Sequence, residues 1–255
     1  MRILVFSLLL LLALPAPTPA SDAFVVGVDP QSPPFSSLGR AEFSGFDVDM
    51  IYALAKEMNA EAGLAPIKHT EFESALNKGD IDAAISGIFL PEHPAPGLDY
   101  SAPYFEGGQR ILVRIDTTDV TQAKDLNGLI VGTRLGTPAA ETLYKLAPMA
   151  MPSLFTRIED AYRELMRNDL DAVFYDSAAV DAHAVELCQG KVKIVGPVYE
   201  QRPYVIALRR DSPFKARLDA AIESLHASGK FEIIRKRWFG EAGATAPCAP
   251  KAPAQ

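Results

Sequence analysis

The eleven residues Leu76-Asn-Lys-Gly-Asp-Ile-Asp-Ala-Ala-Ile-Ser86 return 89 positions later as Leu165-Met-Arg-Asn-Asp-Leu-Asp-Ala-Val-Phe-Tyr175. The leucine, the two aspartates and the alanine after them are identical, and Lys/Arg and Ile/Leu match by type. In each copy an amphipathic stretch reaches a Gly or Asn, residues that end helices in the left-handed conformation, and a short apolar run follows. Each copy therefore predicts a helix and then a buried parallel strand, whose tip carries Gly87 or Asp176.

Two copies of this unit favour two α/β lobes. Ligands of open α/β sheets bind beyond the carboxyl ends of the strands. Two lobes that turn their strand tips toward each other would share one binding site. A cleft between two lobes is therefore the first functional hypothesis.

The amino-terminal residues predict export. Arg2 precedes an apolar run over 3–14, and small residues follow up to Ala20, a pattern typical of a secretory signal peptide over 1–20. The run is shorter than the roughly 20 residues that a membrane span needs. We expect cleavage near Ala20 and a soluble, monomeric protein in the periplasm. The formal net charge of −7 disfavours binding to nucleic acid or to anionic lipid.

Cysteine and histidine usage predicts no metal site and no cofactor. The four histidines are scattered, and no Cys/His cluster has the spacing of metal ligands. Cys188 and Cys248 are the only cysteines, and the sequence leaves a disulfide and two free thiols equally open. Cys248 lies in an Ala/Pro-rich tail, 241–255, that we predict to be disordered.

Between these ends, the pattern predicts a chain that crosses between lobes twice. An apolar strand over 24–28 ends at Asp29, and a helix follows with Asp47 as its N-cap. A Gly-Gly segment over 104–108 is a candidate hinge, and 204–208 is a candidate return strand. Thr137 and Pro138 suit the start of a helix in the second lobe. Core positions on three helices are expected at Ile51, Leu54, Ala55, Met58, Leu218, Ile222, Leu225, Phe231, Ile234 and Trp238.

Taken in order, these pieces resemble the periplasmic solute-binding proteins of ABC importers, in the branch that binds polar amino acids such as glutamine. The resemblance runs from Phe24 to about Gly240, and the order and spacing of its motifs make it specific. It rests on Gly45-Phe-Asp-Val-Asp49, Gly79-Asp-Ile-Asp-Ala83, Asp99-Tyr-Ser-Ala-Pro-Tyr-Phe105, Lys124-Asp-Leu-Asn-Gly128, Gly136-Thr137, Asp169-Leu-Asp-Ala172 with Asp176, and Trp238-Phe-Gly240.

The resemblance implies the type II periplasmic binding protein fold: two α/β lobes, each a mostly parallel sheet flanked by helices, joined by two crossing hinge strands. It implies a first lobe over 21–108 plus 204–240 and an inserted second lobe over 109–203, which close on a solute by hinge motion. The hinge and the return strand inferred from the residues agree with this organisation.

One part of the family's pattern is missing. After the first strand tip, family members that bind α-amino acids carry two threonines and an arginine that grips the ligand α-carboxylate. This chain has Phe89 and Pro91 at the threonines and Pro94 at the arginine. Neither Pro94 nor the neighbouring His93 can form the bidentate pair. The family also has about three more residues after the aromatic position at Phe72.

The resemblance implies a set of ligand contacts, each of which has a structural alternative. Asp176 matches the acceptor of the ligand's ammonium group, and its alternative is a helix N-cap. Phe72 matches an aromatic that stacks on ligands, and its alternative is core burial. The alternatives are a solvated charge for Arg134, a helix cap for Thr137 and a turn for Asp29. The candidate ligand-binding residues are Asp176, Thr137, Arg134, Asp29, Phe72, Gly87 and Phe89.

The leading hypothesis is a non-enzymatic binding protein that hands a small polar, amine-containing solute to an ABC permease in the inner membrane. A retained Asp176 and a lost arginine predict an ammonium or other donor group without an ordinary α-carboxylate contact. A second hypothesis is a sensor or accessory to another periplasmic system. A third is a dehydratase-like enzyme on the same scaffold, with Glu92 and His93 as the suggestive pair.

Overall fold

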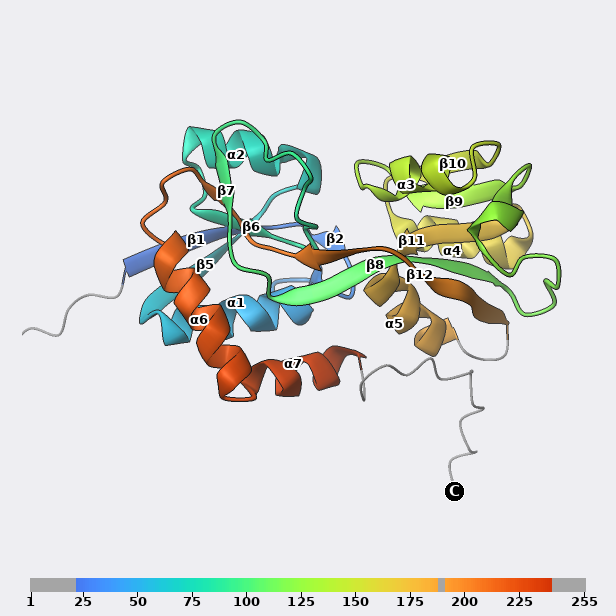
Figure 1. The fold of residues 1–255 in the computed structure, drawn as a ribbon. Helices are drawn as coiled ribbons and strands as arrows, with labels where there is room; N and C mark the ends of the chain where they lie inside the picture. The colour runs from blue at the N-terminus through green and yellow to red at the C-terminus, as the bar shows by residue number, and fades with distance from the viewer. Residues whose placement is uncertain (1–21, 188–190, 240–255) are drawn as a thin grey trace, which may run out of the picture.

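The computed structural model describes residues 22–187 and 191–239, and it contains two α/β lobes joined by a pair of long strands (Figure 1). The predicted signal peptide, Cys188, Gly240, Cys248 and the predicted tail lie outside the described residues. Within the described ranges, no helix is both long enough and apolar enough to span a membrane.

The first lobe is built on a five-stranded sheet with the order β5-β1-β6-β13-β7. β1 pairs in parallel with β5 and β6, and β13 returns antiparallel to β6 and β7. The strands are β1 (Asp22–Val28), β5 (Ala60–Pro66), β6 (Ala83–Ile85), β7 (Leu98–Tyr100) and β13 (Ala207–Arg209), and the helices are α1 (Phe46–Glu57), α2 (Phe72–Lys78), α6 (Lys215–Ala227) and α7 (Lys230–Phe239). A small sheet of β2 (Gln31–Ser32), β3 (Ser36–Leu38) and β4 (Phe43–Ser44) and a 3₁₀ turn, η1 (His69–Glu71), lie beside it.

The second lobe repeats this plan with the strand order β10-β9-β11-β8-β12. Its strands are β8 (Phe105–Arg114), β9 (Ile130–Arg134), β10 (Met151–Phe155), β11 (Ala172–Asp176) and β12 (Val192–Tyr204), and its helices are η2 (Ala123–Leu126), α3 (Ala139–Leu146), α4 (Ile158–Arg167) and α5 (Ser177–Leu187). β9, β10 and β11 are parallel, and β8 and β12 are antiparallel to their neighbours. The two-lobed α/β fold class is thus confirmed.

The repeated sequence forms the same helix, cap and strand in both lobes. α2 ends at Gly79 and α4 at Asn168, both left-handed, with φ of 79° and 69°. The second aspartate of each copy then fixes the neighbouring strand. Asp82 Oδ2 accepts the backbone N–H of Val25 at 2.8 Å, and Asp171 Oδ2 accepts that of Ile130 at 2.8 Å. These aspartates hold the start of the adjacent strand, which explains why the repeat keeps them.

β8 and β12 cross from one lobe to the other as an antiparallel pair (Figure 1). Tyr204 is opposite Phe105 near the first lobe, and Val192 is opposite Arg114 at the far end of the second. The pairing is irregular in the middle, where the register shifts on both sides of Tyr199. The predicted lobe boundaries at 108 and 203 fall within this pair, and their positions stay a prediction.

The predicted helix faces form the core. Ile51, Leu54, Leu218, Ile222 and Leu225 are buried, while Ile234 and Trp238 are partly buried against the same cluster. α7 packs on α1 and α6 and also touches α5, so the last described helix reaches from the first lobe to the second (Figure 1).

Gly107 provides a test of the crossing strands. A methyl group at this position would collide with the ring and hydroxyl of Tyr204, which has no exposed surface. We expect Gly107→Ala to reduce the free energy of unfolding by about 1–3 kcal/mol, as overpacking does in other cores. Gly63→Ala is the matched control, because nothing lies within 4 Å of the added carbon there. Urea denaturation measures both, and equal stability of the two variants would contradict the packing described for Tyr204.

Candidate ligand-binding site

A cavity of about 80 Å³ lies where the strand tips of the two lobes meet. The first lobe contributes the loop after β1, η1 and the residues that follow β6. The second lobe contributes the ends of β9 and β11, the start of α3 and one residue of β8. The lining residues are Ser32, Phe35, His69, Ser86, Gly87, Ile88, Phe89, Gln109, Arg134, Thr137, Pro138, Tyr175 and Asp176.

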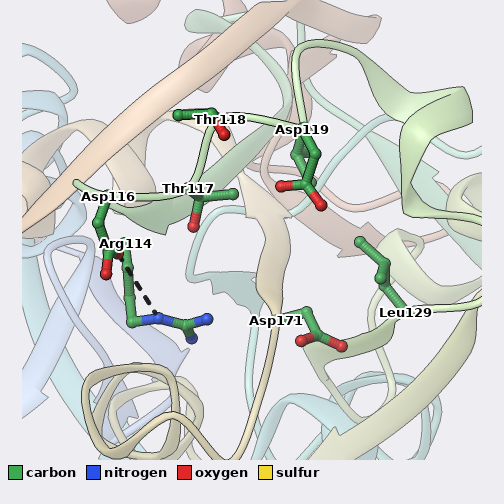
Figure 2. Close-up of a pocket in the computed structure, with 8 residues that line it drawn as sticks. Arg114, Asp116, Thr117, Thr118, Asp119, Leu129 and Asp171 are labelled. Carbon is green, nitrogen blue, oxygen red and sulfur yellow. Dashed lines mark ion pairs between the residues drawn. The ribbon is translucent and has the colours of Figure 1, made fainter.

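A larger hollow of about 380 Å³ lies in the second lobe at the opposite ends of β9 and β11 (Figure 2). Two of its charged side chains already have partners within the lobe. Arg114 donates to the carbonyls of Leu165 and Leu170, and Asp171 accepts the Ile130 N–H. Because α/β sheets bind ligands at the carboxyl ends of their strands, we assign the site to the smaller interlobe cavity.

Asp176 lines this cavity at the end of β11, and it is 4 % exposed. Its Oδ2 accepts the hydroxyl of Tyr204 at 2.5 Å, and its Oδ1 accepts the N–H of Ala179 at 3.1 Å in the first turn of α5. It therefore caps α5 and faces the cavity at the same time. Burial raises the pKa of the Asp176 carboxyl to about 7, although these hydrogen bonds act to lower it.

Gln109 lies directly beside Asp176, since the two residues are opposite each other in the β11–β8 pairing. Its side chain is 3 % exposed and lines the cavity, and no described residue donates a hydrogen bond to its Oε1. A buried acceptor without a donor costs about 1–3 kcal/mol. Asp176 and Gln109 thus place two acceptor groups side by side on the cavity wall.

Arg134 and Asp29 form an ion pair between the lobes. Arg134 Nη2 lies 2.7 Å from Asp29 Oδ2, and Arg134 Nη1 donates to Ser32 Oγ at 2.9 Å. Both charged residues are buried, with 6 % and 3 % exposure. Arg134 lines the cavity, whereas Asp29 lies behind it, where Oδ1 also accepts the Gln31 N–H at 2.8 Å.

A family model described as bacterial extracellular solute-binding proteins, family 3, matches residues 24–241. The chain belongs to this family. It is 27% identical over 225 residues to ABC transporter arginine-binding protein 1 of Escherichia coli K12, covering 86% of this chain and 92% of that one. It is 29% identical over 246 residues to a probable histidine-binding protein of Neisseria gonorrhoeae, covering 92% and 89%. The solved structure of an ancestral arginine-binding protein bound to arginine is 31% identical, with a TM-score of 0.78 and coverage of 86% and 98%.

Most of the predicted contacts of this solute-binding protein meet at the cavity. Asp176, Arg134, Thr137, Gly87 and Phe89 line it. The structural alternative for Thr137 was a helix cap, but its side chain does not cap α3. Its hydroxyl donates to the Arg134 carbonyl at 2.9 Å instead.

Phe72 lies elsewhere. It is 4 % exposed in a separate apolar cluster with Leu76 and Ile81, and its ring approaches Gly27 of β1. It does not line the cavity, which agrees with the alternative of core burial.

The segment after Ile88, where the resemblance implies a carboxylate clamp, contacts the crossing strand β12. The Leu90 N–H donates to the Pro203 carbonyl at 2.8 Å, and Phe89 stacks on Tyr204 with ring centroids 4.5 Å apart. Glu92, His93 and Pro94 are exposed, and none of them lines the cavity. Glu92 pairs with Arg202 of β12 at 2.7 Å, so the Glu92–His93 pair of the enzyme hypothesis faces away from the site.

Sequence reasoning missed several lining residues. Ser86 and Tyr175 are the last residues of the two repeat copies, so the repeat itself carried a signal for them. No sequence signal pointed to Gln109, because its position beside Asp176 depends on the β8–β11 register. His69 follows the edge strand β5, and burial together with nearby Arg134 lowers its pKa to about 4, which keeps the imidazole neutral.

The expected role of Asp47 as an N-cap is wrong. Gly45 holds that position, and Asp47 lies in the first turn of α1 with no exposed surface. Its carboxylate accepts the Gly87 N–H at 2.7 Å and the Tyr104 hydroxyl at 2.9 Å. Gly87, at φ 62°, is thereby held at the cavity lip. Burial raises the pKa of Asp47 to about 7.

The raised pKa of Asp47 predicts a pH-dependent stability. Its folded pKa lies above the ordinary value of 3.8, so its contribution to stability is complete below about pH 4 and is lost as the pH rises through about 7. We expect the melting temperature of the wild type to fall between pH 5 and pH 8, and to fall less in Asp47→Asn. Asn can keep both contacts, since the Tyr104 oxygen also accepts. One pKa unit corresponds to about 1.4 kcal/mol, which calorimetry resolves.

The control for this test is Asp80→Asn, which removes an exposed carboxylate from the turn after α2. It should keep the wild-type slope of melting temperature against pH. An Asp47→Asn slope equal to that of the wild type would show that Asp47 does not titrate in this range.

Proposed function

We propose that this protein captures a small polar solute carrying an amine or ammonium group in its interlobe cleft and delivers it to an ABC-type permease. We infer that it acts after export to the periplasm. Its family comprises extracellular solute-binding proteins, and the two relatives named above are described as binding arginine and histidine. Both of those amino acids carry an α-ammonium group.

The pair of acceptors at Asp176 and Gln109 carries the proposal. An ammonium group has three N–H donors and no acceptor. Placed between these side chains, it would form a charge-assisted bond to Asp176 and supply the donor that Gln109 Oε1 lacks. A purely anionic solute would leave Gln109 without a donor and would face a buried carboxylate.

Hinge opening is required for entry. Ligand pockets commonly have volumes of about 300–1,000 Å³, whereas this cavity measures about 80 Å³. Its walls come from both lobes, which are joined by β8 and β12. Separation of the lobes around these strands would expose the strand tips, and closure would surround the solute.

The first test of this function is a thermal-shift screen. We expect amine-bearing solutes to raise the melting temperature, because a ligand at about 100 times its Kd adds roughly 2.7 kcal/mol of stability. Asp176→Asn should abolish or strongly reduce the shift. Asp169→Asn removes an exposed carboxylate from the turn after α4 and should respond like the wild type. Equal responses of the Asp176 variant and the wild type would rule out Asp176 as the ammonium acceptor.

The second test is the pH dependence of binding. A proton on the Asp176 carboxyl competes with a ligand ammonium, and the pKa of this group is about 7. We expect affinity to weaken below pH 7 by up to about tenfold per pH unit and to level off above it. Titration calorimetry in buffers with different ionisation enthalpies should also detect proton release at pH 6. Affinity that stays constant from pH 5.5 to pH 8 would contradict this assignment.

A further inference from the structure

The Arg134–Asp29 pair connects opposite walls of the cleft. Arg134 is the last residue of β9 in the second lobe, and Asp29 follows β1 in the first. Arg134 faces the cavity and has Tyr175 of β11 as a neighbour, and its hydrogen bonds to Asp29 and Ser32 reach into the first lobe. A guanidinium has five N–H donors in a planar fork that suits carboxylates.

We propose that Arg134 is the carboxylate-recognising residue of the cleft, and that Asp29 occupies its donors until the carboxylate of the solute displaces it. This inference rests on the proposed function and narrows its ligand class to zwitterions. The solute would carry its ammonium to Asp176 and its carboxylate to Arg134.

The position of Arg134 fits a zwitterion. β9 and β11 are neighbouring parallel strands, and Arg134 and Asp176 are their last residues. The strand register places Tyr175 opposite Arg134 and Asp176 one residue further along. Arg134 and Asp176 both line the cavity, so their opposite charges can hold the two charged groups of one small molecule. Such an arrangement replaces the arginine that the first lobe lacks at Pro94, because the second lobe alone would hold both charges of the solute.

Asp29 can release Arg134 without losing all its partners. Its Oδ1 accepts the Gln31 N–H at 2.8 Å, and its Oδ2 accepts the His69 N–H at 3.3 Å, in addition to Arg134. After displacement, both backbone donors would still satisfy the carboxylate. Without Asp29, Arg134 would keep only the neutral hydroxyls of Ser32 and Tyr175, and a buried charge without a charged partner is strongly destabilising. An internal carboxylate therefore keeps Arg134 inside the cleft in the absence of solute.

The competing interpretation is a latch, in which the Asp29–Arg134 pair persists when solute is bound and holds the lobes closed. The two interpretations predict opposite effects of Asp29→Asn. Removal of a displaceable carboxylate strengthens binding of a solute carboxylate. Removal of a latch weakens binding of every solute.

The experiment compares the wild type, Asp29→Asn, the double variant Asp29→Asn with Arg134→Met, and Glu92→Gln. The last variant is the matched control, because it removes the carboxylate of the Arg202–Glu92 pair outside the cavity. The probes are arginine against agmatine and histidine against histamine, pairs that differ only in the α-carboxylate. Sodium acetate against sodium chloride at equal ionic strength provides a probe that needs no knowledge of the natural solute.

In Asp29→Asn we expect the affinity for the amino acid, divided by the affinity for its amine, to rise about tenfold, equivalent to about 1.4 kcal/mol. Acetate should raise the melting temperature of Asp29→Asn more than that of the wild type or Glu92→Gln. The double variant should lose both gains. If Asp29→Asn does not fold, Asp29→Ser keeps an acceptor for the Gln31 N–H and takes its place.

Two results would overturn the inference: no added response to acetate in the Asp29 variant, or an equal loss of affinity for amino acids and amines. Failure of the proposed function has a different signature. In that case neither amino acids nor amines stabilise any of the proteins, whatever the response of the Asp29 variant to acetate.

Discussion

The hydrogen bond from the Tyr204 hydroxyl to Asp176 links the hinge to the binding site. Tyr204 ends β12 on the side of the first lobe, and its oxygen lies 2.5 Å from Asp176 Oδ2 in the second. Its ring is held by Phe89 and Phe105 and passes over Gly107, where only a hydrogen atom fits. Any rotation of the lobes about the crossing strands moves this ring. Hinge rotation of the kind proposed above would therefore change the geometry of the Asp176 acceptor.

The two lobes share one plan but divide the work unequally. In the second lobe, the strand tips carry the charged groups that face the cavity, Asp176 and Arg134. In the first lobe, the tip after β6 carries Gly87, and the chain then runs along β12 through Phe89 and Leu90. The segment that would hold a ligand in the family's usual arrangement is used here to stack against the hinge. In the proposed site, the charged contacts to the solute would therefore come from the second lobe.

The sequence predicted the fold well, because the repeat encodes local physics. The left-handed caps at Gly79 and Asn168 and the strand-fixing Asp82 and Asp171 depend on residues close in the chain or on one neighbouring strand. The strand tips of the repeat pointed to Gly87 and Asp176, and the family resemblance pointed to Arg134, Thr137 and Phe89; all five line the cavity. Gln109 could not be found in this way, since its position beside Asp176 arises from register.

Asp47 shows a different limit. Near the start of a helix, an aspartate is normally an N-cap or a surface charge, so the local sequence favoured a cap for Asp47. Its burial follows from Tyr104 and the Gly87 N–H, which come from segments far away in the chain. Phe72 was uncertain because residue type alone does not distinguish an aromatic that stacks on a ligand from one that packs in the core, where Phe72 lies.

Binding of a solute ammonium would be coupled to the ionisation of the buried carboxyls. Asp47 and Asp176 both have pKa values raised to about 7, and Asp47 is raised further by the charge of Asp176. Burial is the main cause of both shifts, so each carboxyl favours its neutral form in the closed cleft. A solute ammonium at Asp176 would stabilise the ionised form of this carboxyl. The energy that favours the closed state would then come from the solute itself, which is the condition under which a binding protein closes only when it is loaded.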